Sequence, residues 1–401
     1  MGVLRHEDRV FSQQTFLLMA LSFLVLPMNV IRDLSFGYRD PDLASKICKH
    51  IKSLASDQHY LIMHVCGTHE ATIVRHGLRA LLPRNVEVRA GPGCPVCVTN
   101  PGEIDAVSRI AANDGACVTT FGDMLRVPGI RSSLEKVKSS GADIRVVYGV
   151  HDAIEMARKE PDKDFVHFSI GFETTAPATA VELLGSPPRN FSVFSSHKLI
   201  PPAMVSLLRL GEVSIDGFIC PGHVSTIIGL EPYKPISNEF KIPQVVAGFE
   251  PLDVLIAVAM ILRQIRDGRS EVENEYSRSV HPSGNKKALS IMSRVFDPCP
   301  SAWRGFGVIP QSSLRLKDGF SAWDSTVRFE VESEIAYEMP KDCRCGEVVR
   351  GRIYPQDCPL FNNECTPSNP IGPCAVSREG SCFIAMRYGG DPSWERAETR
   401  S

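Results

Sequence analysis

Short apolar runs alternate with helical patterns of hydrophobic residues from about residue 40 to residue 267. Apolar runs bounded by turn residues predict strands at 60–65, 86–90, 117–121, 144–149, 165–170, 191–194, 217–220 and 244–247. Strands that alternate with helices pair in parallel, because each crossover helix returns the chain to the same end of the sheet. The pattern therefore predicts an α/β fold built on parallel sheets.

Helix signals surround these runs. Asp40 can cap a helix that has Pro41 at its first position, and apolar residues then recur at helical spacing up to Leu54. We also expect helices over 252–265 and 288–296, a polar surface connection over 269–285, and strands near 303–308 and 329–331. The chain after about residue 267 thus lacks the regular alternation of strands and helices that precedes it.

The length of the chain favours several domains. Its 401 residues exceed the roughly 250–300 beyond which a single core rarely grows. We predict α/β domains with open parallel sheets over residues 28–149 and 150–280, and a cysteine-rich C-terminal domain over 281–401. The strands could instead close a barrel, but the length and a break near Gly149 favour two open sheets.

Residues 1–27 stand outside this pattern. Phe16 to Leu26 is an apolar run that is too short to span a bilayer, and no small-x-small cleavage site follows it. Both acidic and basic residues precede it. We interpret residues 1–27 as a non-native or upstream-start extension ahead of Met28, with a secretory signal as the alternative.

Composition and missing motifs exclude several classes of protein. A formal net charge of −2, with 22% charged residues, argues against a nucleic-acid or membrane-binding surface. No G-x-x-x-x-G-K-[ST] loop, G-x-S-x-G elbow or Cys-x-x-x-Cys-x-x-Cys triplet occurs. The sequence therefore disfavours a P-loop NTPase, an α/β-hydrolase and a radical-SAM enzyme.

Cysteines follow two consecutive predicted strands. Cys66 comes directly after strand 60–65, and the Cys94-x-x-Cys97 pair follows strand 86–90 between glycines and prolines. Such a pair can close a disulfide, bind a soft metal, or pass from one state to the other. Because ligands bind outside the carboxyl ends of parallel strands, we expect all three cysteines along one edge.

Polar residues also follow several later strands. Asp152 and Glu250 are explained most simply as caps of the helices that come next. His223, after Pro221-Gly222, is balanced between a functional group and a structural histidine. These positions extend the candidate site without defining its chemistry.

A second cysteine centre lies near the C-terminus. Of the thirteen cysteines, six crowd into forty residues: Cys343, Cys345, Cys358, Cys365, Cys374 and Cys382. Prolines and glycines between them leave no long helix or strand, so we expect a metal to order the segment. The spacing matches neither a ferredoxin nor a paired zinc ribbon, which leaves iron-sulfur and zinc open. The clustering suits a reducing, cytoplasmic compartment.

The motifs together resemble one family. They are Cys66 to Glu70, Gly91 to Cys97, Gly171 to Pro177, Pro221 to Ser225 and the run from Cys343 to Cys382. In this order they are similar to the HypD family of [NiFe]-hydrogenase maturation proteins, from about Met28 to Tyr388. The resemblance implies a cytoplasmic scaffold that assembles the Fe(CN)2CO moiety of the hydrogenase active site. It also implies a HypC-type chaperone and a HypE-type cyanide donor as partners.

The resemblance further implies roles for individual residues. Cys66 would bind the iron, Cys94 and Cys97 would form the neighbouring redox pair, and His69 and Glu70 would orient or polarise the site. His223 lies in a matching motif and joins the candidate residues. A [4Fe-4S] cluster would use the ligands Cys343, Cys358, Cys365 and Cys382. Cys345 and Cys374 would then remain as a thiol–disulfide pair beside the cluster.

Two other functions remain open. One is an iron-sulfur-dependent protein disulfide reductase that works through Cys94 and Cys97. The other is a zinc-stabilised binding module without a redox role. Infrared bands of metal-bound cyanide and carbon monoxide would separate the scaffold from the reductase, whereas metal analysis would separate zinc from a cluster.

Overall fold

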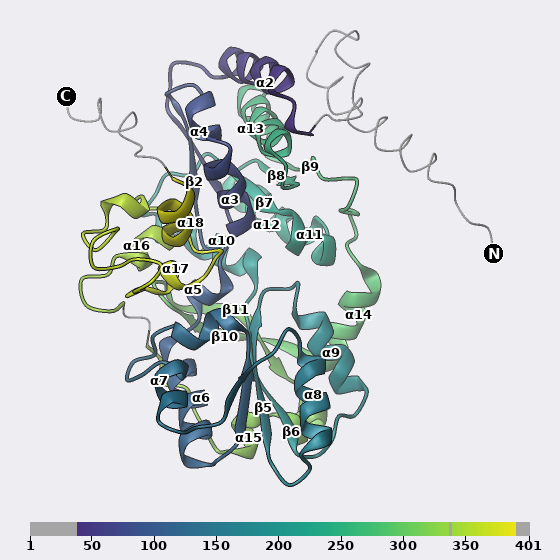
Figure 1. Cartoon of the computed structure of the whole chain (residues 1–401). Coiled ribbons are helices and arrows are strands. Elements are labelled where there is room, and N and C mark those ends of the chain that lie inside the picture. Colours follow the sequence, from purple (N-terminus) through teal and green to yellow (C-terminus); the bar gives the residue numbers. More distant parts are fainter. Residues whose placement is uncertain (1–37, 337–338, 390–401) are drawn as a thin grey trace. The chain divides into compact units, whose positions relative to one another are not determined.

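The computed structural model describes residues 38–336 and 339–389, so the expected extension over residues 1–27 lies outside the described residues. The chain forms two compact units (Figure 1). Of the described residues, unit 1 combines 38–64 with Thr72–Val88 and Ile215–Gly284, and unit 2 combines Val65–Ala71 and Arg89–Ser214 with 285–336 and 339–389. The boundaries expected at residues 149 and 280 do not coincide with these units, because each unit is assembled from separated segments.

Unit 1 is built on an open sheet, as expected. Within the described ranges this sheet has five strands in the order β2-β1-β7-β8-β9. The strands are β1 (Tyr60–His64), β2 (Val86–Ala90), β7 (Gly217–Pro221), β8 (Gln244–Ala247) and β9 (Val272–Asn274). β1 pairs in parallel with β7, β7 with β8, and β8 with β9. Only β9 was missed, because it lies in the polar stretch that we interpreted as a connection.

Helices bury the apolar face of this sheet. They are α2 (Pro41–Leu54), α3 (Gly67–Arg75), α4 (Leu78–Leu81), α11 (Gly222–Ile228), α12 (Lys234–Phe240) and α13 (Pro251–Arg266), with the short 3-10 helix η4 (Glu231–Tyr233). Asp40 caps α2 as predicted, because its Oδ1 accepts hydrogen bonds from the N–H groups of Asp42 (2.8 Å) and Leu43 (3.1 Å). The apolar face of α2 packs on α13 and completes the core of unit 1.

Unit 2 contains the second open parallel sheet. Within the described ranges it has four strands in the order β4-β3-β5-β6. They are β3 (Cys117–Thr120), β4 (Ile144–Val146), β5 (Phe165–Gly171) and β6 (Phe191–His197). All neighbours in this sheet are parallel, which confirms the prediction from the apolar runs.

The helices of unit 2 follow these strands and the preceding cysteine motif. They are α5 (Pro95–Val98), α6 (Pro101–Asn113), η3 (Gly122–Arg126), α7 (Leu134–Ser139), α8 (Val150–Lys159), α9 (Ala176–Leu184), α10 (Ile200–Leu210), α14 (Lys286–Val295), η5 (Asp318–Trp323) and α15 (Ser325–Arg328). A core of aliphatic and phenylalanine side chains lies between the sheet and α6. The alternation of strands and helices thus continues as the sequence predicts.

An antiparallel ribbon replaces the strand expected near 303–308. β10 (Phe296–Trp303) pairs with β11 (Gly307–Leu316), so the expected strand is in fact mostly the turn between them. Gly305 and Gly307 both have positive φ angles there, which suits a turn and not a strand. The helix expected over 288–296 ends at Val295, and residues 329–331 form no strand. The helix was therefore predicted correctly, whereas the two strands were not, and at 303–308 the reason is that the turn glycines lie inside an apolar stretch.

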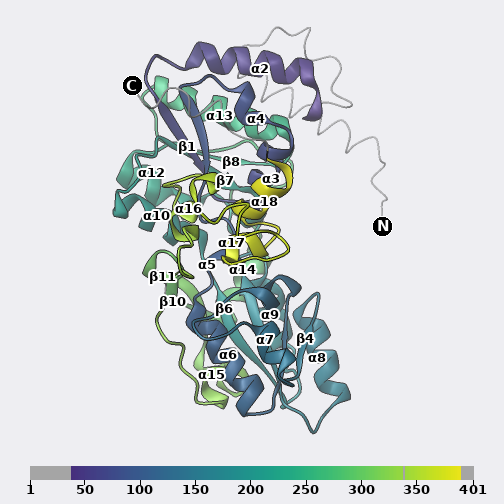
Figure 2. The same cartoon turned by 60° about the vertical axis from the view of Figure 1, so that its left-hand side comes forward.

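The cysteine-rich segment has only short elements, as expected. They are α16 (Cys345–Val349), η6 (Pro355–Asp357), α17 (Pro373–Val376) and α18 (Ser381–Tyr388), and Figure 2 shows them gathered together. The described part of the chain contains no helix long and apolar enough to cross a membrane.

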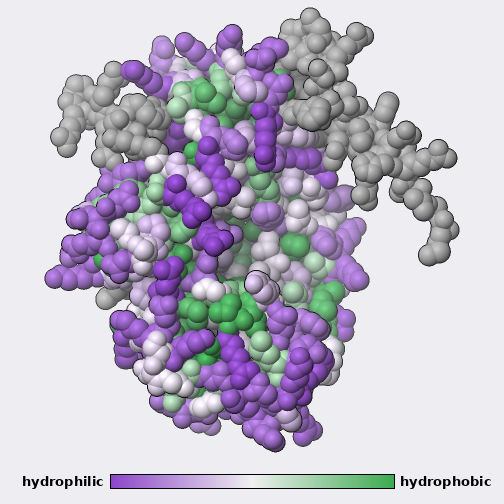
Figure 3. Space-filling model, viewed as in Figure 1, coloured by the Kyte–Doolittle hydropathy of each residue, from purple (hydrophilic) through white to green (hydrophobic). Residues whose placement is uncertain are grey.

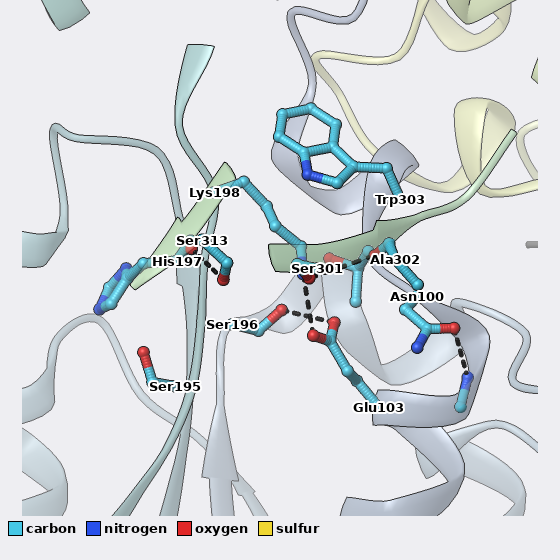
Figure 4. Close-up of polar contacts among 12 residues, drawn as sticks. Asn100, Glu103, Ser195, Ser196, His197, Lys198, Ser301, Ala302, Trp303 and Ser313 are labelled. Atoms are coloured by element: carbon cyan, nitrogen blue, oxygen red, sulfur yellow. Dashed lines mark hydrogen bonds and ion pairs between the residues drawn. The ribbon is translucent and has the colours of Figure 1, made fainter. Parts of the chain in front are cut away.

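A buried ionic network joins α6, β6 and β10 in unit 2 (Figure 4). The Lys198 side chain is fully buried, and its Nζ donates to Glu103 Oε1 (2.8 Å) and Ser301 Oγ (2.7 Å). Ser196 Oγ donates to the other carboxylate oxygen of Glu103 at 2.7 Å. A buried charge pair is tolerated when its remaining lone pairs and protons are satisfied in this way. The network fixes the start of α6, which follows the Cys94–Cys97 motif.

Candidate functional site

Cys66 lies between β1 and α3 and is nearly buried, with 8% of its surface exposed. The N–H of Gly67 donates to the carbonyl oxygen of Gly93 at 3.2 Å. A Cβ atom on Gly93 would overlap the main chain of Cys66, so this position requires glycine. The structure therefore brings Cys66 against the segment that carries Cys94, as the order of strands and motifs predicts.

Burial raises the pKa of the Cys66 thiol to about 11. Hydrogen bonds from the backbone N–H groups of His69 and Thr68 act in the opposite direction, whereas the negative charge of Glu379 raises the pKa further. The thiol is therefore protonated at neutral pH. A metal that binds this sulfur must displace a proton, so binding strengthens as the pH rises.

His69 and Glu70 lie in the first turn of α3, directly after Cys66. Both side chains are buried, and the N–H of Glu70 donates to the carbonyl oxygen of Cys66 at 3.2 Å. Glu379 was missed by the sequence analysis, although its main chain lies so close to Gly67 that a Cβ atom there would clash. Its contact with the Cys66 motif spans more than three hundred residues, which no local pattern shows.

Cys94 and Cys97 form a disulfide in the structure. Cys94 caps α5, with its sulfur 3.1 Å from the N–H of Cys97. Cys97 is fully buried and Cys94 is 5% exposed. Of the three states that the sequence left open for this pair, the structure shows the oxidised one.

A second disulfide joins Cys345 to Cys374. Cys97 Sγ lies 4.0 Å from the carbonyl oxygen of Pro373, the residue before Cys374. The four sulfurs of both disulfides belong to one buried cluster with Val348, Val349 and Leu360. The two disulfides thus occupy neighbouring segments of unit 2.

Four other cysteines of the segment are free thiols: Cys343, Cys358, Cys365 and Cys382. Burial raises the pKa of Cys382 well above its usual value, and the charges of the three other sulfurs raise it further. Burial likewise raises the pKa of Cys343 to about 11. The four sulfurs therefore lie close enough to repel one another as thiolates.

Backbone N–H groups point at two of these sulfurs. The N–H of Cys345 donates to Cys343 Sγ at 3.5 Å, and that of Ile371 donates to Cys365 Sγ at 3.3 Å. Among the described residues, no group of three or more His, Cys, Asp and Glu side chains surrounds a single metal position. The four thiols thus form one electrostatic group without the compact geometry of a mononuclear site.

Glu173 is a candidate residue that the sequence analysis did not single out. It follows β5 in the Gly171–Pro177 motif and is 3% exposed. Its Oε1 accepts the N–H of Ile200 at 3.0 Å, whereas its Oε2 is buried without a hydrogen-bond partner. Burial raises the pKa of this carboxyl to about 7. Its position as the one charged residue of the Gly171–Pro177 motif at a strand end was the signal that could have identified it.

The remaining polar residues at strand ends have different environments. His223, in unit 1, stacks on Phe249 with a centroid distance of 3.9 Å, and although the residue as a whole is exposed, partial desolvation of its ring lowers its pKa. Asp152 accepts the N–H of Gly149 at 3.2 Å at the start of α8, as expected for a cap. Glu250 precedes α13 and forms an ion pair with Arg39. The structure therefore gives Asp152 a capping role and leaves the role of His223 open.

Surface hollows in unit 2 lie away from the cysteines. A hollow of about 820 Å³ is lined by Arg109, Glu330 and their neighbours, and one of about 510 Å³ lies beside it. No cysteine lines either of them. Most of the face in Figure 3 is hydrophilic, with apolar residues gathered low in the view. These two hollows therefore do not belong to the candidate site built on the cysteines.

The fold and the site define a class of α/β protein with open parallel sheets and a cysteine-rich C-terminal segment. The family described as "HypD: Hydrogenase formation hypA family" matches residues 42–389. This chain belongs to the HypD family of hydrogenase maturation factors.

Individual relatives agree with this assignment. A Methanocaldococcus jannaschii protein assigned to hydrogenase expression or formation is 47% identical over 353 residues, or 87% of this chain and 98% of its own length. The hydrogenase maturation factor HypD of Rhizobium leguminosarum bv. viciae is 46% identical over 364 residues, covering 88% and 94%. That of Cupriavidus necator is 44% identical over 364 residues, covering 88% and 96%. The similarity therefore spans both units and the cysteine-rich segment.

The raised pKa of Glu173 predicts a pH-dependent stability. Between about pH 4.5 and 7 the folded chain keeps a proton that the unfolded chain has lost, so the free energy of unfolding falls as the pH rises. The total loss is about 3 kcal/mol, reached above pH 7. Glu173→Gln removes this term. Urea unfolding at pH 5 and pH 8 measures the free energy of unfolding. Between these two pH values, that of the variant should rise relative to that of the wild type by this amount.

The exposed Glu135 of α7 offers a matched control. Glu135→Gln should leave the pH profile of the wild type unchanged. Equal pH profiles for the wild type and Glu173→Gln would show that the buried carboxyl does not titrate in this range.

Proposed function

We propose that the chain is the scaffold on which the Fe(CN)2CO moiety of [NiFe] hydrogenase is assembled, with Cys66 as the iron ligand. The contact between Gly93 and Cys66 carries this proposal, because it holds a single thiol beside a redox-capable pair. A thiolate is a suitable ligand for iron that also binds strong-field diatomic molecules. The HypC-type chaperone and the HypE-type cyanide donor are the partners that this role requires.

The cysteine-rich segment would hold a [4Fe-4S] cluster. Four free thiols that interact electrostatically match the four-cysteine donor set of such a cluster, and two other cysteines are already paired with each other. Backbone N–H groups directed at the sulfurs of Cys343 and Cys365 suit bound thiolates, whose charge they stabilise. Zinc also binds thiolates, so the metal and sulfide content of the chain separates the two centres.

The two disulfides would then form a relay. The cluster, when bound, supplies electrons one at a time. With two electrons and two protons, Cys345 and Cys374 become a dithiol. One of their thiolates attacks the Cys94–Cys97 disulfide, and the second thiol resolves the mixed disulfide. Cys345–Cys374 is thereby oxidised again, and Cys94 and Cys97 become thiols beside Cys66.

A protein disulfide reductase is a weaker alternative. Such an enzyme needs a sulfur that a second protein can reach. Cys97 is fully buried, and Cys94 exposes only 5% of its surface. Both sulfurs are therefore better placed for exchange within the chain than for attack on an external substrate.

The relay predicts a specific loss. Cys345→Ala combined with Cys374→Ala should leave Cys94 and Cys97 oxidised and abolish maturation, because no electrons reach the pair. Hydrogenase activity in cells that carry only the variant, together with differential alkylation and mass spectrometry, measures both effects. Cys299→Ala, at a free cysteine outside both pairs, is the control. Normal hydrogenase activity in the double variant would disprove the relay.

The ligand role of Cys66 predicts an infrared signature. The chain, purified without oxygen together with its HypC-type partner, should show bands of metal-bound cyanide and carbon monoxide. Cys66→Ser should lose these bands, because a hydroxyl is a poor ligand for this iron. Cys48→Ser changes a different free cysteine, which lies on α2, and should keep these bands. Bands of full intensity in Cys66→Ser would exclude Cys66 as the ligand.

A further inference from the structure

Arg304 is a buried arginine in the turn between β10 and β11, with only 1% of its surface exposed. Its backbone N–H donates to the carbonyl oxygen of Val98 at 2.9 Å, and its Nε donates to that of Thr99 at 3.1 Å. Its Nη2 donates to the carbonyl oxygen of Pro128. Arg304 therefore connects three separate stretches of main chain, one of which follows Cys97 directly.

The helix that carries Cys97 depends on these contacts. α5 has only 4 residues, and it ends at Val98 with Thr99 as its C-cap. The last carbonyl groups of a helix have no partner within the helix, so they need donors from elsewhere. The N–H groups of a guanidinium have a fixed geometry, which sets both the distance and the direction of the carbonyls that accept them. Arg304 thus fixes where α5 ends.

The same turn contacts the helix that begins at Cys345. A Cβ atom on Gly305 would come within 2.8 Å of Gly346 Cα, so the two main chains lie directly against each other. Arg350, at the other end of α16, donates to the carbonyl oxygen of Gly305. The turn therefore contacts α5 through Arg304 and both ends of α16 through Gly305.

The turn is itself anchored in unit 2. Trp303, at the end of β10, is fully buried, and its Nε1 donates to Ser312 Oγ of β11 at 2.9 Å (Figure 4). Its ring stacks on Phe172 with a centroid distance of 6.2 Å. The N–H of Phe306 donates to the carbonyl oxygen of Trp303 at 3.0 Å and closes the turn. A turn fixed in this way holds α5 and α16 at a defined separation.

The two helices that carry Cys97 and Cys374 also meet. α17 packs against α5, and Cys97 Sγ lies 4.0 Å from the carbonyl oxygen of Pro373, the residue before Cys374. Exchange between two cysteine pairs requires the attacking sulfur to reach the sulfur of the other pair. A misplacement of about 1 Å can slow such a step by about a hundredfold. The position of α5 is therefore decisive for exchange inside the chain.

We propose that Arg304 is a positioning residue for thiol–disulfide exchange, and that it holds α5 so that Cys97 and Cys374 are the sulfurs that react. This inference rests on the proposed relay. The thiolate of Cys374 attacks Cys97, and Cys94 leaves as a thiolate. Cys345 then attacks Cys374 in the mixed disulfide, and Cys97 leaves. Each step breaks one S–S bond and forms one, and the departing thiolates take up the protons that the attacking thiols lost.

The test is a cross-link within the full chain, purified without oxygen. Cys94→Ser combined with Cys345→Ser keeps one cysteine of each pair. Diamide then accepts two electrons and two protons from the two remaining thiols, which should close a disulfide between Cys97 and Cys374. Mass spectrometry of the peptides, sampled over time after quenching with an alkylating agent, gives the rate of its formation.

Changes on either side of the turn should slow this cross-link. Adding Arg304→Met should lower the rate about tenfold, because the end of α5 loses its side-chain donors. Arg304→Lys should be slow as well, since a single ammonium group cannot reproduce the fork that reaches Thr99 and Pro128. Gly305→Ala should act from the other side, because its Cβ atom pushes the turn away from Gly346.

Arg145→Met, added to the same background, is the matched control. Arg145 forms ion pairs with Asp143 and Glu160 in another part of unit 2. Its replacement should lower the free energy of unfolding without slowing the cross-link. A general loss of stability would slow both kinds of variant, whereas a positioning role slows only those at the turn.

The outcomes separate this inference from the relay. An unchanged rate in Arg304→Met would overturn the inference, and if that variant does not fold, an unchanged rate in Gly305→Ala would do so. A normal rate in Arg304→Lys beside a slow Arg304→Met would show that charge and not position is required, and the inference would fail.

The other three double variants that keep one cysteine of each pair are oxidised in the same way. A faster cross-link in one of them would contradict the pairing of Cys97 with Cys374 and leave the relay intact. No cross-link in any of the four would refute the relay itself.

Discussion

Cysteine side chains fill most of the buried interior of the C-terminal segment, where aliphatic side chains would form an ordinary core. The candidate site depends on this arrangement. The buried cluster there consists largely of cysteines, with few aliphatic side chains such as Val348, Val349 and Leu360. The longest helix of the segment, α18, has 8 residues. Apolar burial on this scale cannot offset the entropy of ordering such a chain. A disulfide can offset this entropy because it constrains the unfolded state, and a metal bound by thiolates can offset it because it binds only the folded state.

The parallel sheets supply the second half of the site. Cys66 follows β1 and the Cys94–Cys97 motif follows β2, and these strands are neighbours in one sheet. Their cysteines therefore emerge at the same edge, where Gly93 meets the main chain of Cys66. The turn between β10 and β11 links the end of the second motif to the sulfur-rich segment, because the N–H of Arg304 donates to the carbonyl oxygen of Val98 at 2.9 Å and Gly305 lies against Gly346. The contact of Gly93 with Cys66 and the contacts of this turn, on which the proposed redox chemistry depends, all lie within unit 2.

Much of the fold could be predicted because buried parallel strands are nearly continuous apolar runs. The strands β2 and β8 were predicted with their observed bounds, and Asp40 caps α2 as its position before Pro41 indicated. β9 was missed because its polar sequence lies at a sheet edge, where burial is weaker. The two units could not be foreseen, because strand order joins segments that are far apart in the sequence.

Only those parts of the candidate site that lie in local sequence motifs were predicted. Cysteine spacing identified both sulfur centres, whereas the assignment of individual cysteines came from the family resemblance. Glu379 gave no local signal, because it lies against the Cys66 motif although it is distant from it in the sequence. A buried charged residue is recognised by its surroundings, and these exist only in the folded chain.

The central claim is that thiolates and a bound iron-sulfur centre order the cysteine-rich segment. Iron, zinc and acid-labile sulfide, measured on the chain purified without oxygen, test it most directly. The account predicts about four iron atoms and four sulfides per chain, with the visible absorption of a thiolate-bound cluster. One zinc ion per chain without sulfide, or a folded segment without any metal, would contradict it.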